Sequence, residues 1–356
     1  MKKLFVVGLS AMLALSMVAG CGGDKKAEEK KADAGKKIVL KLSHVFSPDE
    51  QLYKSMELVA GRIKEKTQGR VEIQCFGQGQ LATYKDGLEQ VAQGANFISV
   101  EDPSYLGDYV PEFKVFAGPM MFQSFEEYEV LCNSDMLAKM KADAEKKNIT
   151  VLALDYVFGF RNVMTNKVVK TPADLKGMKL RTPKSKVYVD TINYMGATAT
   201  ALPWSETLPA VSQKVVDGLE GSEFTNIGTK CYEHVKNVAF TRHLLGTCGV
   251  YINTNVLKSI PEADRKIVIE EFKKGGPEML KISNDSYNKV KAELEAKGVK
   301  FNEVDHAQFD KAILPIYEAM ESKEGVKPGT YKAMKAELEK FPDLICKYKN
   351  CKIAYK

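Results

Sequence analysis

Two arginines, Arg161 and Arg181, lie in the segment GFRNVMTNKVVKTPADLKGMKLRTP, which covers residues 159–183. Arg181 follows the alternating apolar and polar residues of GMKL, which indicate a strand, and Pro183 ends that strand. An arginine at the carboxyl end of a strand can meet an anionic ligand, because its planar guanidinium holds a carboxylate through two parallel hydrogen bonds. The residue types therefore point to recognition of an acid, although the spacing alone also fits a surface arginine paired with a nearby Asp or Glu.

The sequence carries none of the patterns that bring catalytic groups together. It has no G-x-x-x-x-G-K-[ST], G-x-S-x-G or H-E-x-x-H motif and no G-x-G-x-x-G after a strand. We interpret the glycines of CFGQGQLATYKDG as a strand-to-helix turn, because the lysine and hydroxyl residue of a phosphate loop are missing. His44, at the end of the first expected strand, could act as a base, but a lone histidine there is more often packed or hydrogen-bonded. We therefore predict a protein that is not an enzyme and has no cofactor.

The composition is that of a folded protein. The 356 residues are 44% hydrophobic and 28% charged, enough for one large or two medium-sized domains with hydrophobic cores. The net charge of +6 comes from 52 basic and 46 acidic residues without a motif of basic and aromatic residues, which argues against a nucleic-acid partner. The four histidines show no ligand spacing and C-x-x-C does not occur, so no zinc or other metal site is expected.

The first residues read as an export signal. Two lysines precede the apolar run LFVVGLSAMLALSMVAG, and Cys21 follows it. The ending VAGC resembles the bacterial lipoprotein signal, in which the cysteine is lipidated after cleavage; a plain signal peptide or an uncleaved anchor is the alternative. We predict a signal peptide at 1–20 and a flexible tether at 21–37, made of GGDKKAEEKKADAGKK, that holds the protein at the outer side of the cell membrane. No later apolar run reaches the roughly 18 residues of a membrane span.

Six cysteines remain beyond the signal. In an exported protein they could form up to three disulfides, in any of 15 pairings, but free buried thiols fit the sequence as well. The short spacing in CKYKNC suggests a small C-terminal loop. The six are Cys75, Cys132, Cys231, Cys248, Cys346 and Cys351.

Strands and helices alternate along the chain, which predicts a parallel or mixed sheet covered on both faces. In SPDE, Ser47 can cap a helix that has Pro48 at its first position and Glu50 in a capping box. A long extended segment, HLLGTCGVYINT, comes late in the chain, and the helical region 261–298 should be interrupted at GGP. The expected strands and helices are KIVLKLSHV, VEIQCF, YKDGLEQVAQ, NFISV, residues 125–147, VLALDY, FRNVMTN, the capped turn TPADLKG, MKLRT, SKVYVDTINYMG, TATAL, SETLPAVSQK and VVDGLEG.

Several motifs together resemble one protein family. G-x-R, T-P-x-D-L-K-G-x-K-x-R-x-P, M-G-A, P-x-x-E and V-D-G-x-E follow one another in order, and the segments LSHVFSPDE, KEKTQGRVEIQCFGQGQL and VFAGPMMFQSFEEYE match the family's N-terminal half. This pattern resembles the solute-binding proteins of TRAP transporters (tripartite ATP-independent periplasmic transporters), of the dicarboxylate-binding type. The resemblance covers about residues 37–327. It implies an α/β, two-lobe fold like that of periplasmic binding proteins, with a ligand cleft between the lobes and long connecting helix and strand elements.

The lobe boundaries follow from this resemblance and from the order of the elements. Lobe I is expected at 38–157, with about 247–286 returning to it. Lobe II is expected at 158–246, with about 287–327 contributing. Residues 328–356 would form a C-terminal extension.

The resemblance also assigns roles to the two arginines. In the family, the arginine that matches Arg181 grips the carboxylate of the solute, and the one that matches Arg161 supports it. Many relatives have an asparagine directly after V-D-G-x-E; here Gly221 takes that place, which removes one hydrogen bond and should leave room for the solute. Glu101 could accept a hydrogen bond from an amine or hydroxyl of the solute, or pair with a basic neighbour. Glu220 of the same turn is expected to be structural.

Aromatic residues are candidates for the walls of the cleft. Trp204, the only tryptophan, could cover an apolar part of the solute, or could pack between the lobes above a helix. Four further aromatic residues are candidates by position, and each also fits a place in the core: Tyr105, Phe158, Phe160 and Phe224.

The sequence therefore predicts a lipid-anchored, extracytoplasmic receptor that captures an organic acid and delivers it to a sodium-coupled TRAP permease. A C4-dicarboxylate is the family default. Two alternatives share the features described so far. One is a ligand-loaded co-receptor for a sensor kinase of the membrane, and the other is an extracellular enzyme acting on carboxylates, which the missing catalytic motifs disfavour.

Overall fold

The computed structural model describes residues 37–341, which belong to one compact unit. The expected signal peptide, the lipidation site at Cys21, all but the last residue of the tether, and the CKYKNC segment lie outside the described residues. None of the helices in 37–341 combines the length and the apolar character that crossing a membrane requires.

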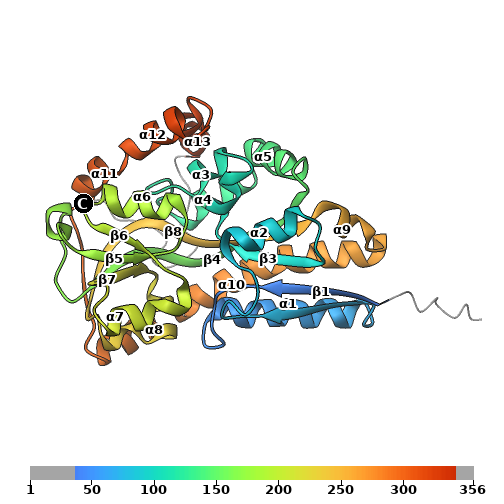
Figure 1. The fold of residues 1–356 in the computed structure, drawn as a ribbon, viewed down its shortest axis with the longest axis horizontal. Coiled ribbons are helices and arrows are strands. Elements are labelled where there is room, and N and C mark those ends of the chain that lie inside the picture. The colour runs from blue at the N-terminus through green and yellow to red at the C-terminus, as the bar shows by residue number, and fades with distance from the viewer. Residues whose placement is uncertain (1–36, 342–356) are drawn as a thin grey trace, which may run out of the picture. The chain divides into compact units, whose positions relative to one another are not determined.

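A single mixed sheet runs through this unit and confirms the expected α/β class (Figure 1). Its strand order is β2-β1-β3-β8-β4-β7-β5-β6, and β9 pairs with β8 beside this path. Strands β1, β2 and β3 pair in parallel at one end, and β5, β6 and β7 pair in parallel at the other. The strands are β1 Ile38–Ser43, β2 Val71–Phe76, β3 Phe97–Glu101, β4 Ile149–Thr165, β5 Lys179–Thr182, β6 Thr198–Ala201, β7 Gly218–Gly221, β8 Asn237–Asn253 and β9 Lys300–Asn302.

Two long strands join the ends of the sheet. Strands β4 and β8 have 17 residues each and run antiparallel to one another along almost their whole length. The register between them shifts near Gly159, whose φ of 102° is accessible to glycine at low cost. We name the half of the sheet with β1 to β3 lobe I and the half with β5 to β7 lobe II. Only the two long strands continue from one lobe into the other within the sheet, and the register between them shifts at four places from Val151 to Val163.

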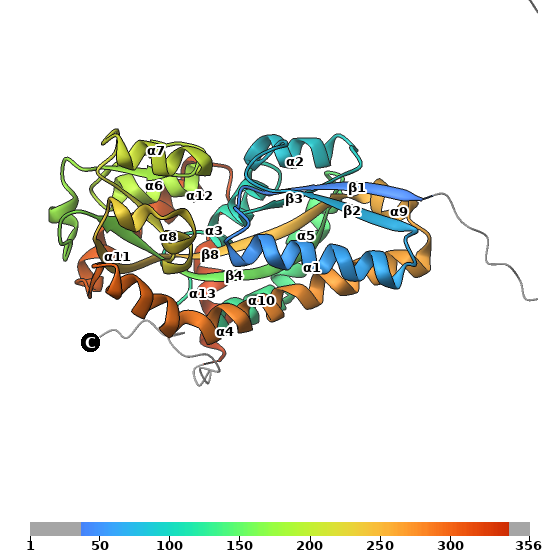
Figure 2. The same ribbon diagram turned by 90° about the horizontal axis from the view of Figure 1, so that it is seen from below.

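Helices cover both faces of the sheet, and α10 extends along both lobes, packing against α1, β4 and α8 (Figure 2). This arrangement follows the alternation of strands and helices in the sequence. The helices are α1 Gln51–Lys66, α2 Tyr84–Ala92, η1 Pro103–Asp108, α3 Glu112–Phe116, α4 Phe125–Cys132, α5 Asp135–Glu145, η2 Pro172–Leu175, α6 Lys186–Tyr194, η3 Trp204–Glu206, α7 Thr207–Ser212, α8 Glu223–Thr229, η4 Cys231–Glu233, α9 Thr254–Ser259, α10 Glu262–Ala296, α11 His306–Ile313, α12 Pro315–Lys323 and α13 Thr330–Glu339.

The core of lobe I lies between the sheet, α1 and α10. Strand residues such as Leu40 and Val250 are fully buried there, against Met56 of α1 and Phe272 of α10. The apolar positions of the first helix recur at the spacing of one helical face, which is why α1 packs on the sheet along its length. Burial of this face stabilises the lobe that carries half of the cleft.

Helix α10 is unbroken over 35 residues, so the interruption expected at GGP is wrong. The two glycines serve close packing against β4 instead. A Cβ atom on Gly275 would lie 2.4 Å from the Tyr156 hydroxyl, and one on Gly276 would lie 2.4 Å from an Asp155 carboxylate oxygen. Pro277 is held inside the helix by this packing, although it lacks the N–H group that would continue the hydrogen-bond ladder.

Two helix boundaries also differ from the expectation. The single helix expected around 125–147 is divided into α4 and α5, because the Ser134 hydroxyl accepts a hydrogen bond from Leu137 N and starts a new helix. The first helix begins at Gln51 and not at Pro48. There the Glu50 carboxylate folds back and accepts the N–H of Ser47 at 2.8 Å, so SPDE forms a turn ahead of the helix.

Four of the six cysteines lie within 37–341, and all four are free thiols. They are Cys75, Cys132, Cys231 and Cys248. In this part of the chain, no three or more His, Cys, Asp or Glu side chains are grouped as metal ligands.

We predict that replacing Gly275 by alanine destabilises the fold. The added methyl group would enter space held by Tyr156 and by Val59, 2.7 Å away, and overpacking of this kind costs about 1–3 kcal/mol. Gly61→Ala in α1 is the matched control, because its Cβ would meet no atom within 4 Å and alanine favours a helix by about 0.5–1 kcal/mol. Urea unfolding should therefore show free energies of unfolding that change in opposite directions. Equal stability of the two variants would contradict the packing role.

Candidate functional site

The order of three neighbouring strands brings the two arginines together. Arg161 lies on β4 and Arg181 on β5, while Glu220 lies on β7, which separates β4 from β5 in the sheet. In these pairings Arg181 is beside Leu219, and Gly221 is beside Asn162. Residues that are 20 to 59 positions apart in the sequence therefore meet at one edge of the lobe II sheet.

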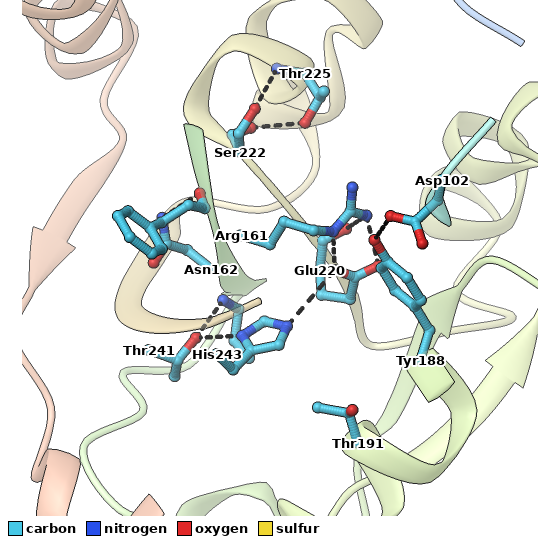
Figure 3. A network of polar contacts seen from close by, with 12 residues as sticks. Asp102, Arg161, Asn162, Tyr188, Thr191, Glu220, Ser222, Thr225, Thr241 and His243 are labelled. Atoms are coloured by element: carbon cyan, nitrogen blue, oxygen red, sulfur yellow. Dashed lines mark hydrogen bonds and ion pairs between the residues drawn. The ribbon is translucent and has the colours of Figure 1, made fainter. Parts of the chain in front are cut away.

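Arg161 forms a buried, two-pronged ion pair with Glu220 (Figure 3). Its Nε and Nη2 atoms donate to the two carboxylate oxygens at 2.5 and 2.7 Å, whereas Nη1 donates to none of the described residues. Burial opposes ionisation of Glu220, but the charge and hydrogen bonds of Arg161 outweigh it and lower the pKa of Glu220 to about 2. The pair is therefore ionised and neutral overall, and Glu220 has the structural role that the sequence predicted.

Further polar side chains hold this pair in place. His243 Nε2 lies 3.6 Å from a Glu220 oxygen, and burial lowers the pKa of His243. The Tyr188 ring lies 5.0 Å from Arg161 Cζ, and its hydroxyl donates to Asp102 at 2.6 Å. Because Asp102 belongs to lobe I and Tyr188 to lobe II, the network crosses between the lobes (Figure 3).

Arg181 is buried, with 1% of its surface exposed, and differs from Arg161 in lacking a carboxylate partner. Its Nε and Nη2 atoms donate to the carbonyl oxygen of Leu202 at 3.1 and 2.7 Å, and its guanidinium lies 5.0 Å from the Trp204 ring. No ion pair joins it to an acidic residue within 37–341. Burial lowers its pKa, which is the direction expected for a cation removed from water. A charge in this position can be compensated by an anionic ligand.

Trp204 connects Arg181 with lobe I. Its backbone N–H donates to the Tyr84 hydroxyl at 2.8 Å, and its indole Nε1 donates to Glu50 Oε2 at 3.2 Å. Tyr84 and Glu50 both belong to lobe I. The lobes therefore touch in this structure, and Trp204 stands at the contact, as the sequence allowed.

Glu101 positions Tyr84. Its carboxylate accepts the backbone N–H of Tyr84 at 2.7 Å, and Tyr84 has a φ of 57°, a value rare for a bulky residue. The Tyr84 ring is held against Tyr105, with 5.7 Å between the centroids. Burial raises the pKa of Glu101 to about 8. One Glu101 oxygen is thus occupied by the backbone, and its contact with a solute stays a prediction.

A pocket of about 500 Å³ opens beside these residues. Tyr105 lines it and has a buried hydroxyl without a hydrogen-bond partner in the described chain, and Lys184 lies there without a carboxylate partner. Trp204 and Tyr105 are therefore brought together in one pocket next to Arg181. Its lining is Val45, Gln78, Gly79, Thr83, Tyr84, Lys85, Asp86, Tyr105, Lys184, Pro203, Trp204 and Ser205.

Phe160 and Phe224 lie elsewhere, at a second hollow of about 30 Å³ between β4, α8 and α10. There Phe160 stacks on Phe125 at 5.5 Å, and Phe224 meets Tyr287 edge to face at 6.1 Å. The structure separates these two candidates from the pocket beside Arg181. The sequence could not make this distinction, because Phe160 is next to Arg161 and Phe224 comes shortly after the V-D-G-x-E turn.

Two other candidates are enclosed by neighbours. A Cβ atom on Gly221 would lie 2.8 Å from the Thr225 hydroxyl, so the room expected at this glycine is already filled. His44 is fully buried; its Nδ1 accepts the N–H of Phe46 at 3.2 Å, and burial lowers its pKa to about 4. His44 is therefore neutral at pH 7, and its Nε2 has no partner in the described chain.

Sequence reasoning missed several residues of the site. Glu50 was interpreted only as a helix cap, and Tyr84, Lys184 and His243 were not singled out. The roles of these residues depend on contacts between distant segments, which a local sequence pattern does not indicate. Lys184 closely follows the predicted strand MKLRT, and this is the one signal that could have identified it, whereas Tyr84 is the first residue of an expected helix.

We predict that Glu101→Gln flattens the dependence of stability on pH. A carboxyl group whose folded pKa is raised from 4.5 to about 8 stabilises the fold fully below pH 4.5, and this contribution is lost as pH rises through 8. Glutamine can still accept the Tyr84 N–H but does not titrate. The free energy of unfolding from urea titrations at pH 5 and pH 9 should therefore fall less in the variant than in the parent. Glu65→Gln, on the exposed side of α1, is the control and should keep the parental slope; a Glu101→Gln variant that also kept it would contradict the prediction.

Comparison with known proteins agrees with this architecture. A crystal structure of a TRAP periplasmic solute binding protein from Desulfovibrio salexigens, in complex with diglycerolphosphate, is 57% identical, covers 86% of this chain and 98% of its own, and has a TM-score of 0.83. One from Fusobacterium, with bound sn-glycerol-3-phosphate, is 40% identical over 85% of this chain and 98% of its own, also with a TM-score of 0.83. A C4-dicarboxylate-binding periplasmic protein of Rhodobacter capsulatus is 26% identical over 84% of this chain and 90% of its own.

These relatives confirm the predicted two-lobe fold and the TRAP assignment. They do not confirm the dicarboxylate-binding subtype, because similar proteins hold different acids, and they give no support to a sensor-kinase co-receptor. The model of the family described as bacterial extracellular solute-binding protein, family 7, matches residues 42–324. The chain therefore belongs to this family of extracytoplasmic receptors, whose members serve TRAP transporters.

Proposed function

We propose that this protein is the receptor for a phosphate ester of glycerol or a similar short polyol, which it delivers to a TRAP permease. The observation that carries the proposal is the buried charge of Arg181, which no carboxylate within 37–341 compensates. A planar guanidinium can hold either a carboxylate or a phosphate through two parallel hydrogen bonds. The chemistry of the site therefore supports an oxyanion ligand, and it does not distinguish a carboxylate from a phosphate.

The more similar relatives favour phosphate. The structures with 57% and 40% identity hold diglycerolphosphate and sn-glycerol-3-phosphate, whereas the dicarboxylate-binding relative is only 26% identical. Lys184 adds a second reason, because its ammonium group lines the pocket without an ion pair among the described residues and can attract an anion to the cleft. A phosphate ester therefore replaces the C4-dicarboxylate as the preferred solute.

Closure of the lobes would strengthen this recognition. Trp204 contacts Tyr84 and Glu50 across the cleft, so a solute held by Arg181 would be shielded from water in this arrangement. Electrostatic attraction is stronger where water is excluded. We also propose that a lipid on Cys21 attaches the receptor to the membrane. This attachment would keep the receptor near its permease.

A binding experiment on the full-length chain tests the proposal. A solute that binds only the folded protein should add about 2.7 kcal/mol of stability at 100 times its Kd, which thermal melting detects. We expect sn-glycerol-3-phosphate or a glycerol phosphodiester to raise the melting temperature, and glycerol or succinate to leave it unchanged. Recovery of the solute unchanged after incubation would separate a receptor from an enzyme.

Arg181→Lys should weaken binding of the phosphate ester by about 100-fold or more, because lysine keeps the charge but loses the planar fork. Arg265→Lys is the matched control, since Arg265 is half-buried on α10 and its guanidinium donates a hydrogen bond to Lys258 O at 3.1 Å, not to a residue of the site. Isothermal titration calorimetry gives both affinities. Parental affinity in Arg181→Lys would remove this arginine from the site, and a response to succinate alone would overturn the phosphate assignment.

A further inference from the structure

The related structures hold diglycerolphosphate and sn-glycerol-3-phosphate, and so leave open how many ester arms and charges the solute of this chain has. We infer that it is a singly charged phosphodiester, with one hydroxylated arm in the pocket lined by Tyr105 and the first turn of α2. This inference rests on the proposed function and goes beyond it by fixing the charge and the shape of the solute.

The charges of the arginines provide the first argument. Arg161 is compensated by the two carboxylate oxygens of Glu220, whereas Arg181 has no carboxylate partner in the described chain. The interior of the cleft therefore offers one uncompensated cation. A phosphodiester has one negative charge, but a phosphate monoester has nearly two at neutral pH, since its second pKa is about 6. The second charge would be buried without a partner, which is costly.

Acidic groups of lobe I make a second negative charge still less favourable. Glu50 and Glu101 are buried, and Asp102 is half-buried, on the lobe I side of the cleft. Burial raises the pKa of Glu50 to about 7 and that of Glu101 to about 8, so at pH 8 both groups carry at least part of a negative charge and would repel a second charge on the solute. Two lysines also line the pocket: Lys85 is paired with Asp108 at 3.3 Å, and Lys184 is exposed, where water and salt weaken its attraction.

The first turn of α2 supplies donors to the pocket. The Thr83 side chain caps no N–H group, and the N–H groups of Lys85 and Asp86 meet no acceptor in residues 37–341. Both residues line the pocket. Such free N–H groups at a helix start attract oxygen atoms. The Asp86 carboxylate lies in the same turn, so this end of the pocket combines donors with an acceptor and would repel a second anion. This combination suits hydroxyl groups.

The Tyr105 hydroxyl is an independent sign of a ligand. Tyr105 is 7% exposed and lines the pocket, and its hydroxyl has no hydrogen-bond partner among the described residues. A buried polar group left without a partner costs about 1–3 kcal/mol, so an unpaired one at a pocket indicates that a ligand supplies the partner. The pocket volume of about 500 Å³ also exceeds the space that a phosphate group alone would fill.

Calorimetric titration of the full-length chain at pH 8 with three probes tests the inference. The probes are glycerophosphoglycerol, sn-glycerol-3-phosphate and diethyl phosphate, a diester without hydroxyl groups. We expect glycerophosphoglycerol to bind at least 10-fold more tightly than either of the others. Equal or tighter binding of the monoester would overturn the inference and leave the proposed function standing. If none of the three binds, the proposed function itself fails.

Two variants separate the arm from the charge. Tyr105→Phe should lose most of the preference for glycerophosphoglycerol over diethyl phosphate, while affinity for diethyl phosphate stays at the parental value; Tyr194→Phe, on α6, is the control that keeps the preference. Glu220→Gln removes the charge that compensates Arg161 and should shift the preference toward the monoester. Glu223→Gln, a buried carboxyl that pairs with neither arginine, is its control. A Tyr105→Phe variant with the parental preference would contradict the placement of the arm, even if Glu220→Gln does not fold.

Discussion

The uncompensated charge of Arg181 is the constraint on which the site depends. Removing an ion from water costs several kcal/mol even after the protein relaxes, and the Leu202 carbonyl and the Trp204 ring offset only part of that cost. The neighbouring Arg161 avoids this cost through Glu220. The two arginines therefore have different roles. Arg161 stabilises the arrangement of β4, β7 and β5, whereas the positive charge of Arg181 remains available to an anion.

Contact between the lobes follows from the same constraint. Trp204 covers Arg181 on one side and donates to Tyr84 and Glu50 of lobe I on the other, so access to the cation and contact between the lobes depend on one residue. A solute that meets the charge of Arg181 stabilises the arrangement in which these hydrogen bonds exist, and the hydrogen bonds in turn favour retention of the solute. The strained Tyr84, held by Glu101, fixes the lobe I side of this contact before any solute arrives.

The local patterns of the sequence predicted most of the elements and the place of Arg181 at the end of β5, because alternation and capping residues act over a few positions. They failed where packing between distant segments decides. Gly275 to Pro277 form a pattern that usually ends a helix, but α10 continues because the two glycines pack closely against β4. Glu50 lies ahead of α1, where its Oε2 atom accepts both the Ser47 N–H and the Trp204 indole N–H. Phe160 on β4 and Phe224 on α8 line a different hollow from Trp204, because their elements pack with α10 there.

A division of labour within the fold explains how relatives with one architecture hold different acids. The oxyanion-binding frame is built from paired strands, where the register fixes Arg161, Glu220 and Arg181 relative to one another. The adjoining pocket is built mainly from the residues that follow strands and from the start of α2, where a substitution changes a donor or an acceptor without altering the strand pairing. Gly221 illustrates the limit of reasoning from one position, because Thr225 fills the space that its missing side chain leaves. We therefore expect two features to determine which acid this chain binds. One is the net charge of Arg161, Glu220 and Arg181, and the other is the set of hydrogen-bonding groups in the pocket. An arginine alone would bind these acids with similar affinity.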